Sequence, residues 1–293
     1  MLIIGCSGAL KLAKNIAKVL DCEYSGLFTD KFPDGETRVR FETALKNEEV
    51  VLVQSFYKNI NDKLIEVFFA AHTAKDLGAK KVILIAPYFP YMRQDKRFND
   101  GEAISIEVVS KLIKTCIDKI VILDPHLHRK NKLTDIFTIE ALKLTAYPLI
   151  AEYIKENFID ENPVIIGPDE ESYKWAQATA ETIGCEYSIL EKTRHDARNV
   201  EVNFKKKIAL RGRNVIIVDD MISTGHTVIE TIKKLKTLKV KSIRCICIHG
   251  IFIEKALKKI SSYGVEVISS NSIPNPVGKI DVSWMIATRL QEL

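Results

Sequence analysis

The chain has 293 residues, of which 46% are hydrophobic and 28% are charged. This length is large for one hydrophobic core and suits two domains of about 150 residues each. No segment approaches the roughly 18 to 20 consecutive apolar residues that span a bilayer, and the first residues have the pattern of a strand followed by a helix rather than that of a cleavable signal. The sequence therefore predicts a soluble, cytoplasmic protein without a membrane partner.

The net charge of +5 is modest, and the lysines are scattered along predicted helices. A nucleic-acid-binding surface usually concentrates basic residues on one patch, so this distribution argues against a nucleic-acid partner. Small anionic substrates remain compatible with it. The cysteines lie mostly in apolar segments and predict reduced core thiols, without a disulfide framework; they are Cys6, Cys22, Cys116, Cys185, Cys245 and Cys247.

The sequence contains an internal duplication. Residues 2–27 and 164–190 share a strand, a glycine, a helix and the tetrapeptide Cys-Glu-Tyr-Ser in the same order, and the apolar strand Val50–Val53 corresponds to Val215–Val218. Both copies alternate strands with helices, which predicts parallel α/β domains with right-handed crossovers.

The predicted domain boundaries follow from this duplication. The first domain is expected over residues 1–145 and the second over residues 146–293. A helix is predicted over Asp62–Leu77, with Gly78 as its stop.

Three segments of the first half carry polar side chains near predicted turns or strand ends. Residues 32–36, Phe-Pro-Asp-Gly-Glu, predict a hairpin turn, and residues 87–97 form a basic, aromatic segment after the buried strand Val82–Ile85. His126 and His128 follow the strand Ile120–Leu123, and histidines two apart on an extended segment can share a face and bind a metal. Each segment also has an ordinary interpretation as a solvated turn or loop.

Two polar segments follow predicted strands in the second half. Asp169 stands at a strand end, followed by Glu170, Glu171 and Ser172. Residues 191–198 lack apolar periodicity and are predicted to form a mobile loop, for which a solvated charged loop is the simpler interpretation.

The segment Val215–Thr227, VIIVDDMISTGHT, is the most specific in the chain. Four apolar residues of a predicted core strand run directly into Asp219 and Asp220, and a hydroxyl-rich turn then precedes a helix predicted from Val228. Ligands of open parallel sheets bind at the carboxyl ends of the strands, and a turn at a helix N-terminus favours a phosphate. The alternative is an acidic strand end in which Asp220 only caps the following turn.

This segment resembles the phosphoribosyl-diphosphate (PRPP) motif that type I phosphoribosyltransferases share with ribose-phosphate diphosphokinases. The resemblance implies a site for ribose 5-phosphate, with the 5′-phosphate in the loop 223–227 and the acids at the ribose hydroxyls. The residues that it assigns to this site are Asp219, Asp220, Ser223, Thr224, Gly225, His226 and Thr227. The motif alone does not separate a transferase from a diphosphokinase.

The first half narrows the resemblance to the diphosphokinases, also called PRPP synthases. Members of that family build an ATP site from a Phe-x-Asp-Gly-Glu loop and a Tyr-x-Arg-Gln-Asp segment, commonly across a subunit boundary. The residues implied to bind ATP here are Phe32, Asp34, Glu36, Arg93, Gln94, Asp95, Arg97 and His126. Phe32 can stack on adenine, Glu36 can accept from its amine, and Arg93 can hold phosphate oxygens.

The same resemblance assigns the metal and the catalytic flap. It places His126 beside the ATP phosphates and a magnesium ion, and it makes Asp169 a second magnesium residue. Lys192 and Arg194 match the catalytic Lys-x-Arg of a flap that closes over the reacting phosphates. His128 has no counterpart in the family and is predicted to be a loop residue.

Two positions depart from the more widespread form of the family. The Gly-Gly pair expected after Asp169 is replaced by Glu170 and Glu171, and Ser223 stands where a third acid is expected. Both departures resemble archaeal-type members.

The resemblance covers essentially the whole chain. It implies an α/β fold of two duplicated parallel-sheet domains of the type I phosphoribosyltransferase kind, and a magnesium-dependent transfer of the β,γ-diphosphoryl group of ATP to the 1-hydroxyl of ribose 5-phosphate. An ATP site shared between chains implies a homo-oligomer, at least a dimer. The rival functions are a non-catalytic regulatory homologue of the synthase and a phosphoribosyltransferase that consumes PRPP.

Overall fold

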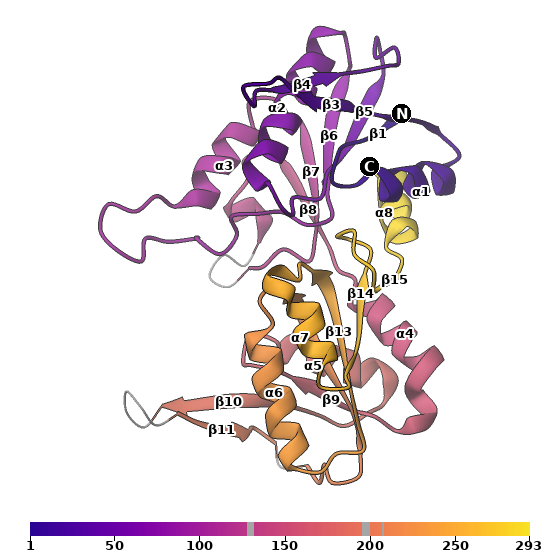
Figure 1. Cartoon of the computed structure of the whole chain (residues 1–293). Coiled ribbons are helices and arrows are strands. Elements are labelled where there is room, and N and C mark those ends of the chain that lie inside the picture. Colours follow the sequence, from indigo (N-terminus) through magenta and orange to yellow (C-terminus); the bar gives the residue numbers. More distant parts are fainter. Residues whose placement is uncertain (128–131, 195–199, 207) are drawn as a thin grey trace. The chain divides into compact units, whose positions relative to one another are not determined.

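The computed structural model describes residues 1–127, 132–194, 200–206 and 208–293 (Figure 1). The chain divides into two compact units. The first consists of residues 1–145, 272–274 and 281–293, and the second of residues 146–271 and 275–280.

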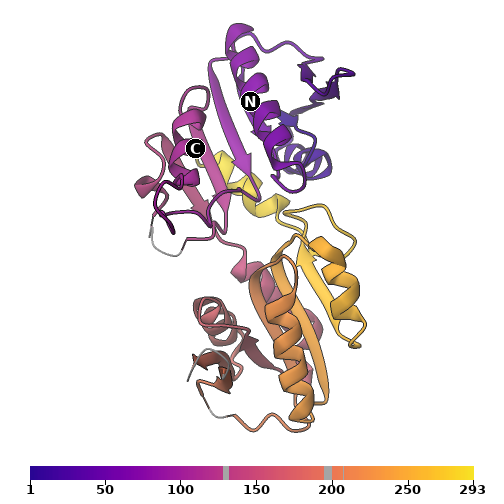
Figure 2. The ribbon, with the colours of Figure 1, turned by 60° about the vertical axis from the view of Figure 1, so that its left-hand side comes forward.

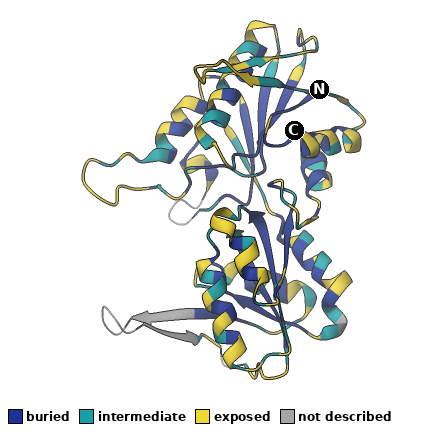
Figure 3. Cartoon of the chain, viewed as in Figure 1, coloured by how far each residue is buried: buried dark blue, intermediate teal, exposed yellow. Residues whose placement is uncertain are grey.

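The first unit is built on a six-stranded parallel sheet in the order β2-β1-β5-β6-β7-β8. Its strands are β1 (Leu2–Gly5), β2 (Glu23–Gly26), β5 (Glu49–Val53), β6 (Lys81–Ala86), β7 (Lys119–Leu123) and β8 (Glu140–Leu144). Its helices are α1 (Leu10–Leu20), α2 (Ile60–Asp76), α3 (Ser105–Ile113) and α8 (Ser283–Gln291), with a 3-10 turn at Leu133–Asp135. The apolar central strands are buried, as expected of a parallel sheet covered by helices (Figure 3).

A separate two-stranded hairpin belongs to the first unit. Strand β3 (Phe28–Lys31) pairs antiparallel with β4 (Thr37–Arg40), and the hairpin lies beside α2. Residues 32–36 form its turn, as the Pro and Gly pattern predicted.

The second unit has a seven-stranded sheet in the order β11-β10-β9-β12-β13-β14-β15. Its strands are β9 (Val164–Gly167), β10 (Tyr187–Arg194), β11 (Val200–Phe204), β12 (Asn214–Ile222), β13 (Ser242–Gly250), β14 (Glu266–Ser270) and β15 (Gly278–Ile280). Its helices are α4 (Tyr147–Phe158), α5 (Tyr173–Ile183), α6 (His226–Thr237) and α7 (Ala256–Ser261), with 3-10 turns at Ile159–Glu161 and Ile253–Lys255. All pairings of this sheet are parallel except that of β10 with β11.

Local boundaries differ from the sequence predictions in three places. Strand β12 continues through both aspartates to Ile222, and α6 begins two residues before the predicted Val228. Residues 191–194, predicted as a loop, continue β10 and pair with β11, so that prediction was wrong. The strand persists there because backbone pairing with β11 does not require an apolar face.

The last helix of the chain belongs to the first unit. Helix α8 packs on α1, and the segment that carries it follows the last strand of the second unit (Figures 1 and 2). Among the described helices, none combines the length and the hydropathy needed to cross a membrane.

Candidate active site

The two aspartates of the second unit lie at the end of its central strand. Both residues are buried, with exposed fractions of 8% for Asp219 and 3% for Asp220. The Asp220 backbone N–H donates to Oδ1 of Asp219 over 3.0 Å. The neighbouring strand β9 runs parallel to β12, so Asp169, two residues beyond β9, lies at the same edge of the sheet.

This crowding of acids changes the protonation of Asp219. Burial raises its pKa well above the usual value of an aspartate, and the negative charges of Asp220 and Asp169 raise it further. The carboxylate is therefore costly to ionise in the ligand-free protein. A group that brings donors or positive charge to this place would favour the ionised form.

The turn after β12 has the shape that the sequence predicted for a phosphate loop. Gly225 has φ of +78°, a left-handed conformation that favours glycine, and it directly precedes α6. A Cβ atom at position 225 would lie only 3.2 Å from Cδ1 of Ile260 and 3.3 Å from Cβ of Ala256. Helix α6 has no side-chain hydrogen bond at its N-cap, so its first N–H groups remain suited to an anion.

The remaining residues of this loop are accessible to different extents. Ser223, Thr224 and Thr227 are half-buried, whereas His226 is exposed. The Ile222 carbonyl, just before the loop, accepts hydrogen bonds of 3.0 Å from the N–H groups of both Ile251 and Phe252. The loop is thus held by the turn after β13.

Asp169 is held in position by a local turn. The glycine pair that usually follows this aspartate in the resembled family is absent from this chain. Oδ1 of Asp169 accepts from the Ser172 N–H over 3.0 Å, and the Ser172 hydroxyl donates to the Asp169 carbonyl over 2.7 Å. Position 167, just before this turn, requires glycine, because a Cβ atom there would lie 2.6 Å from the hydroxyl oxygen of Ser172. Glu170 and Glu171 are exposed.

Lys192 and Arg194 lie on the antiparallel ribbon formed by β10 and β11. In the backbone register Lys192 is paired with Val202 and Arg194 with Val200. Their side chains, and the tip of the ribbon at residues 195–199, lie outside what the structure describes. Their catalytic role stays a prediction.

In the first unit, the hairpin presents the predicted adenine-binding residues at an exposed turn. The Gly35 N–H donates to the Phe32 carbonyl over 2.8 Å, the Phe32 N–H donates to the Glu36 carbonyl over 2.9 Å, and Oδ1 of Asp34 accepts from the Glu36 N–H over 3.2 Å. The Phe32 ring is 46% exposed, with the Arg38 guanidinium 5.4 Å from its centre. The ring is therefore available to a planar ligand.

The second predicted ATP segment lies between β6 and α3. Arg93 and Arg97 are exposed, Asp95 is buried, and Gln94 accepts a 2.6 Å hydrogen bond from the Ser105 hydroxyl at the start of α3. His126 follows β7 and is half-buried. His128, predicted to be a loop residue, falls outside the described residues.

The predicted magnesium residues belong to different units, His126 to the first and Asp169 to the second. No group of three or more His, Cys, Asp or Glu side chains suited to a metal gathers within the described ranges. Magnesium prefers oxygen ligands and takes most of them from phosphates and water, so the carboxylates at the end of β12 and β9 suit it, whereas an imidazole is a poorer ligand.

Sequence reasoning missed two buried polar residues near these sites. His249 is 1% exposed at the end of β13 and is paired in register with Met221. Glu66 is 2% exposed on α2, beside the β3–β4 hairpin. The only sequence signal for either was a polar residue among apolar neighbours.

Replacing Asp219 with asparagine is expected to stabilise the ligand-free protein at pH 8. Because the pKa of Asp219 is raised, the folded protein keeps this proton at pH values at which the unfolded chain has lost it. Stability therefore falls as the pH rises from about 3.9, the ordinary aspartate value, to the raised pKa. We expect Asp219→Asn to raise the thermal midpoint at pH 8 by a few degrees, roughly the effect of 1 kcal/mol in a chain of this size, and by less at pH 4.

Asp76→Asn, an exposed change at the end of α2, is the control and should leave the midpoint unchanged at both pH values. An unchanged or lower midpoint for Asp219→Asn at pH 8 would contradict the raised pKa.

Comparisons with known proteins cover both halves of the chain. Residues 1–116 match the N-terminal domain of ribose phosphate pyrophosphokinase, and residues 133–285 match the phosphoribosyl transferase domain. The ribose-phosphate pyrophosphokinase of Methanothermobacter thermautotrophicus is 37% identical over 293 residues, which cover 99% of this chain and 100% of that protein. That of Saccharolobus solfataricus is 36% identical over 297 residues, with coverage of 99% and 100%.

The fold is also shared with a solved structure. The crystal structure of phosphoribosylpyrophosphate synthetase from Mycobacterium smegmatis matches with a TM-score of 0.86 and 26% identity, over 99% of this chain and 97% of that one. The predicted α/β fold with two parallel sheets is confirmed, as is the resemblance to archaeal-type members. The chain belongs to the ribose-phosphate pyrophosphokinase family.

Proposed function

We propose that the protein transfers the β,γ-diphosphoryl group of ATP to ribose 5-phosphate and releases AMP and PRPP. The 1-hydroxyl oxygen of the sugar attacks the β-phosphorus, the bond from that phosphorus to the α,β-bridging oxygen breaks, and AMP leaves with this oxygen. The observation that carries the proposal is the site at the end of β12, where two buried aspartates meet a glycine turn and a helix N-terminus. The segments predicted to bind ATP on the same chain favour this reaction over base transfer.

The residues at the end of β12 would each bind a different part of ribose 5-phosphate. Asp219 and Asp220 would accept hydrogen bonds from the ribose hydroxyls, because carboxylates are strong acceptors and both lie near the carboxyl end of β12. The N–H groups and hydroxyls of the loop 223–227 would bind the 5′-phosphate at the start of α6. The sugar would then be held at both ends.

The groups assigned to ATP include an aromatic ring, hydrogen-bonding acids and amides, and two arginines whose charge suits polyphosphate. Phe32 would stack on adenine and Glu36 would accept from its amine, while Arg93, Gln94, Asp95, Arg97 and His126 would surround the phosphate chain. Lys192 and Arg194 would meet the charge that develops on the transferring group. Magnesium would be held mostly by phosphate oxygens and water and would neutralise phosphate charge. Asp169 is the protein ligand suited to it, and His126, the other predicted ligand, is the poorer one.

The exposed hairpin turn supports a shared ATP site. Phe32 and its neighbours project from a two-stranded ribbon with little burial of their own, so a second copy of the chain would enclose a nucleotide bound there. We therefore propose a homo-oligomer, at least a dimer. We also propose that the protein is located in the cytoplasm.

The test of the function is to incubate the protein with ATP, Mg²⁺ and ribose 5-phosphate and to separate the nucleotides. AMP that forms only when the sugar phosphate is present is the expected result. If the folded protein binds ATP without forming AMP, a non-catalytic regulatory homologue is the better assignment. Diphosphate release that depends on PRPP and a base would identify a phosphoribosyltransferase.

Asp220→Asn is expected to weaken ribose 5-phosphate binding about tenfold, which corresponds to about 1.4 kcal/mol, because an amide is a weaker acceptor than a carboxylate. Calorimetric titration with ribose 5-phosphate measures this directly. The KM for ATP should change little. Unchanged affinity for the sugar phosphate would remove Asp220 from the site.

Lys192→Ala is expected to lower kcat by at least 100-fold and to leave ribose 5-phosphate affinity within about twofold, because a group that acts on the transferring phosphoryl contributes mainly in the transition state. Steady-state kinetics and a binding titration separate the two effects. A large loss of affinity at unchanged kcat would contradict this role.

A further inference from the structure

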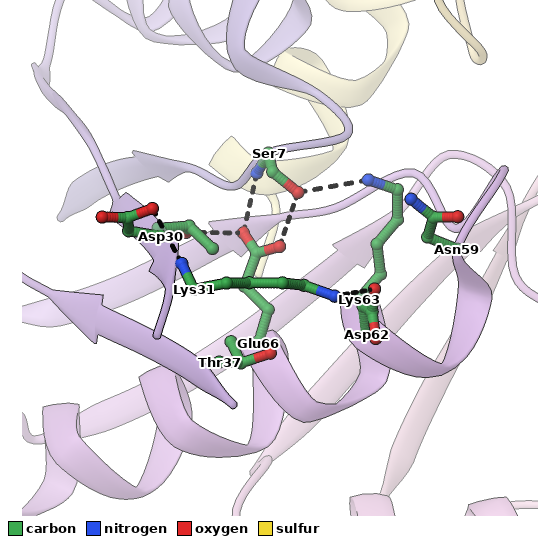
Figure 4. Close-up of a pocket in the computed structure, with 9 residues that line it drawn as sticks. Ser7, Asp30, Lys31, Thr37, Asn59, Asp62, Lys63 and Glu66 are labelled. Carbon is green, nitrogen blue, oxygen red and sulfur yellow. Dashed lines mark hydrogen bonds and ion pairs between the residues drawn. The ribbon is translucent and has the colours of Figure 1, made fainter. Parts of the chain in front are cut away.

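A polar pocket lies where the β3–β4 hairpin meets the rest of the first unit (Figure 4). It has a volume of about 270 Å³ and is lined by Ser7 after β1, by residues of both hairpin strands, and by the first two turns of α2. The hairpin side contributes Thr29, Asp30, Lys31 and Thr37, and the α2 side contributes Asn59, Asp62, Lys63 and Glu66. The pocket is thus the joint between the hairpin and its support.

Glu66 lies at the centre of this joint. Its Oε1 accepts hydrogen bonds from the Ser7 N–H over 2.7 Å and from the Thr29 hydroxyl over 3.2 Å, and its Oε2 accepts from the Ser7 hydroxyl over 2.5 Å. Figure 4 shows the carboxylate pointing from α2 toward Ser7. One side chain therefore joins three segments that are distant in sequence: the turn after β1, strand β3 and helix α2.

The charge of Glu66 is stabilised by these donors. Within the described part of the chain, no lysine or arginine forms an ion pair with it, although the carboxylate is only 2% exposed. Lys63, one turn away on α2, donates to the Ser7 hydroxyl over 3.1 Å. Burial lowers the pKa of Lys63, and the negative charge of Glu66 acts on it in the opposite direction. A buried carboxylate is costly unless it is hydrogen-bonded. The hydrogen bonds to Glu66 therefore also fix the positions of the three donor groups.

An apolar contact also attaches the hairpin, because Val39 of β4 packs against the hydrophobic core of the first unit. The strands of the hairpin are four residues each, all half-buried or exposed, and among the described residues they do not pair with the six-stranded sheet. An isolated two-stranded hairpin is marginally stable in water. A second polar contact with α2 is the ion pair between Lys31 and Asp62, whose charged atoms are 2.6 Å apart. Both side chains are nearly half exposed, so this ion pair contributes little to stability.

We propose that Glu66 is a positioning residue for ATP: through Thr29 and Ser7 it fixes the hairpin that presents Phe32, Asp34 and Glu36. This inference rests on the proposed role of the hairpin turn in ATP binding. Glu66 is too deeply buried to touch the nucleotide itself. Its effect is on the orientation of the turn, and so on ATP affinity rather than on the chemical step.

The test compares the KM for ATP with the KM for ribose 5-phosphate in Glu66→Gln. Glutamine has the same shape and can keep one acceptor, so the chain should fold, but the charge-assisted hydrogen bonds are lost. We expect the KM for ATP to rise about tenfold, while the KM for ribose 5-phosphate and kcat at saturating ATP stay within twofold. Thr29→Val should raise the KM for ATP in the same direction, and the double variant should show less than the product of the two effects.

Asp76→Asn is the matched control, because it removes one negative charge from the exposed end of the same helix. It should leave both KM values unchanged. If Glu66→Gln lowers the thermal midpoint but leaves the KM for ATP within twofold, Glu66 only stabilises the fold and the inference is overturned. Equal increases in both KM values would overturn it as well.

Phe32→Ala separates this inference from the proposed function. If Phe32→Ala raises the KM for ATP and Glu66→Gln does not, the hairpin binds ATP and only the positioning role fails. If Phe32→Ala has no effect, the assignment of the hairpin to ATP fails, whatever Glu66→Gln does.

Discussion

The arrangement of the second unit depends on two carboxylates placed near the end of a largely buried strand. Apolar residues of β12 bring Asp219 into an environment that disfavours negative charge, and the charges of Asp220 and of Asp169, just beyond β9, add repulsion. Such a cluster destabilises a ligand-free fold. The surrounding elements offset this cost through the buried parallel strands on both sides, the Ser172 turn at Asp169, and the hydrogen bonds that hold Ile222. The carboxylates are thus held in fixed positions by the fold itself.

The two units use one topology for different purposes. Each places a strand, a turn and a helix start at the carboxyl edge of a parallel sheet, and each carries an antiparallel pair of strands next to it. In the second unit, strand β12 carries two acids near its carboxyl end. In the first, the equivalent strand β5 runs into Gln54 and Ser55, which are buried and hydrogen-bonded to Gly8 and Ser272. In the first copy this edge of the sheet is therefore packed, whereas the hairpin turn is exposed.

The sequence was sufficient for features in which local pattern and tertiary role agree. The apolar runs of β1, β5, β9 and β12, the Gly225 turn and the hairpin at residues 32–36 all follow from short-range chemistry. Prediction from the sequence failed where contacts with a segment distant in sequence determine the structure. Residues 191–194 have no apolar face, and only pairing with β11 makes them a strand. Glu66 looks like a surface residue of a helix until Ser7 and Thr29 are brought to it. The assignment of α8 to the first unit likewise depends on contacts across more than 260 residues of sequence, from α1 to α8.

That last feature bears on how the chain folds. The second unit is contained within the sequence of the first, because residues 281–293 return to it after β15. The surface of α1 that α8 covers stays open until a segment more than 260 residues away in sequence has docked on it. The first unit is therefore completed only by a contact of very long range. Loop closure over so long a segment costs entropy that grows only slowly with length, so this contact delays folding more than it lowers stability.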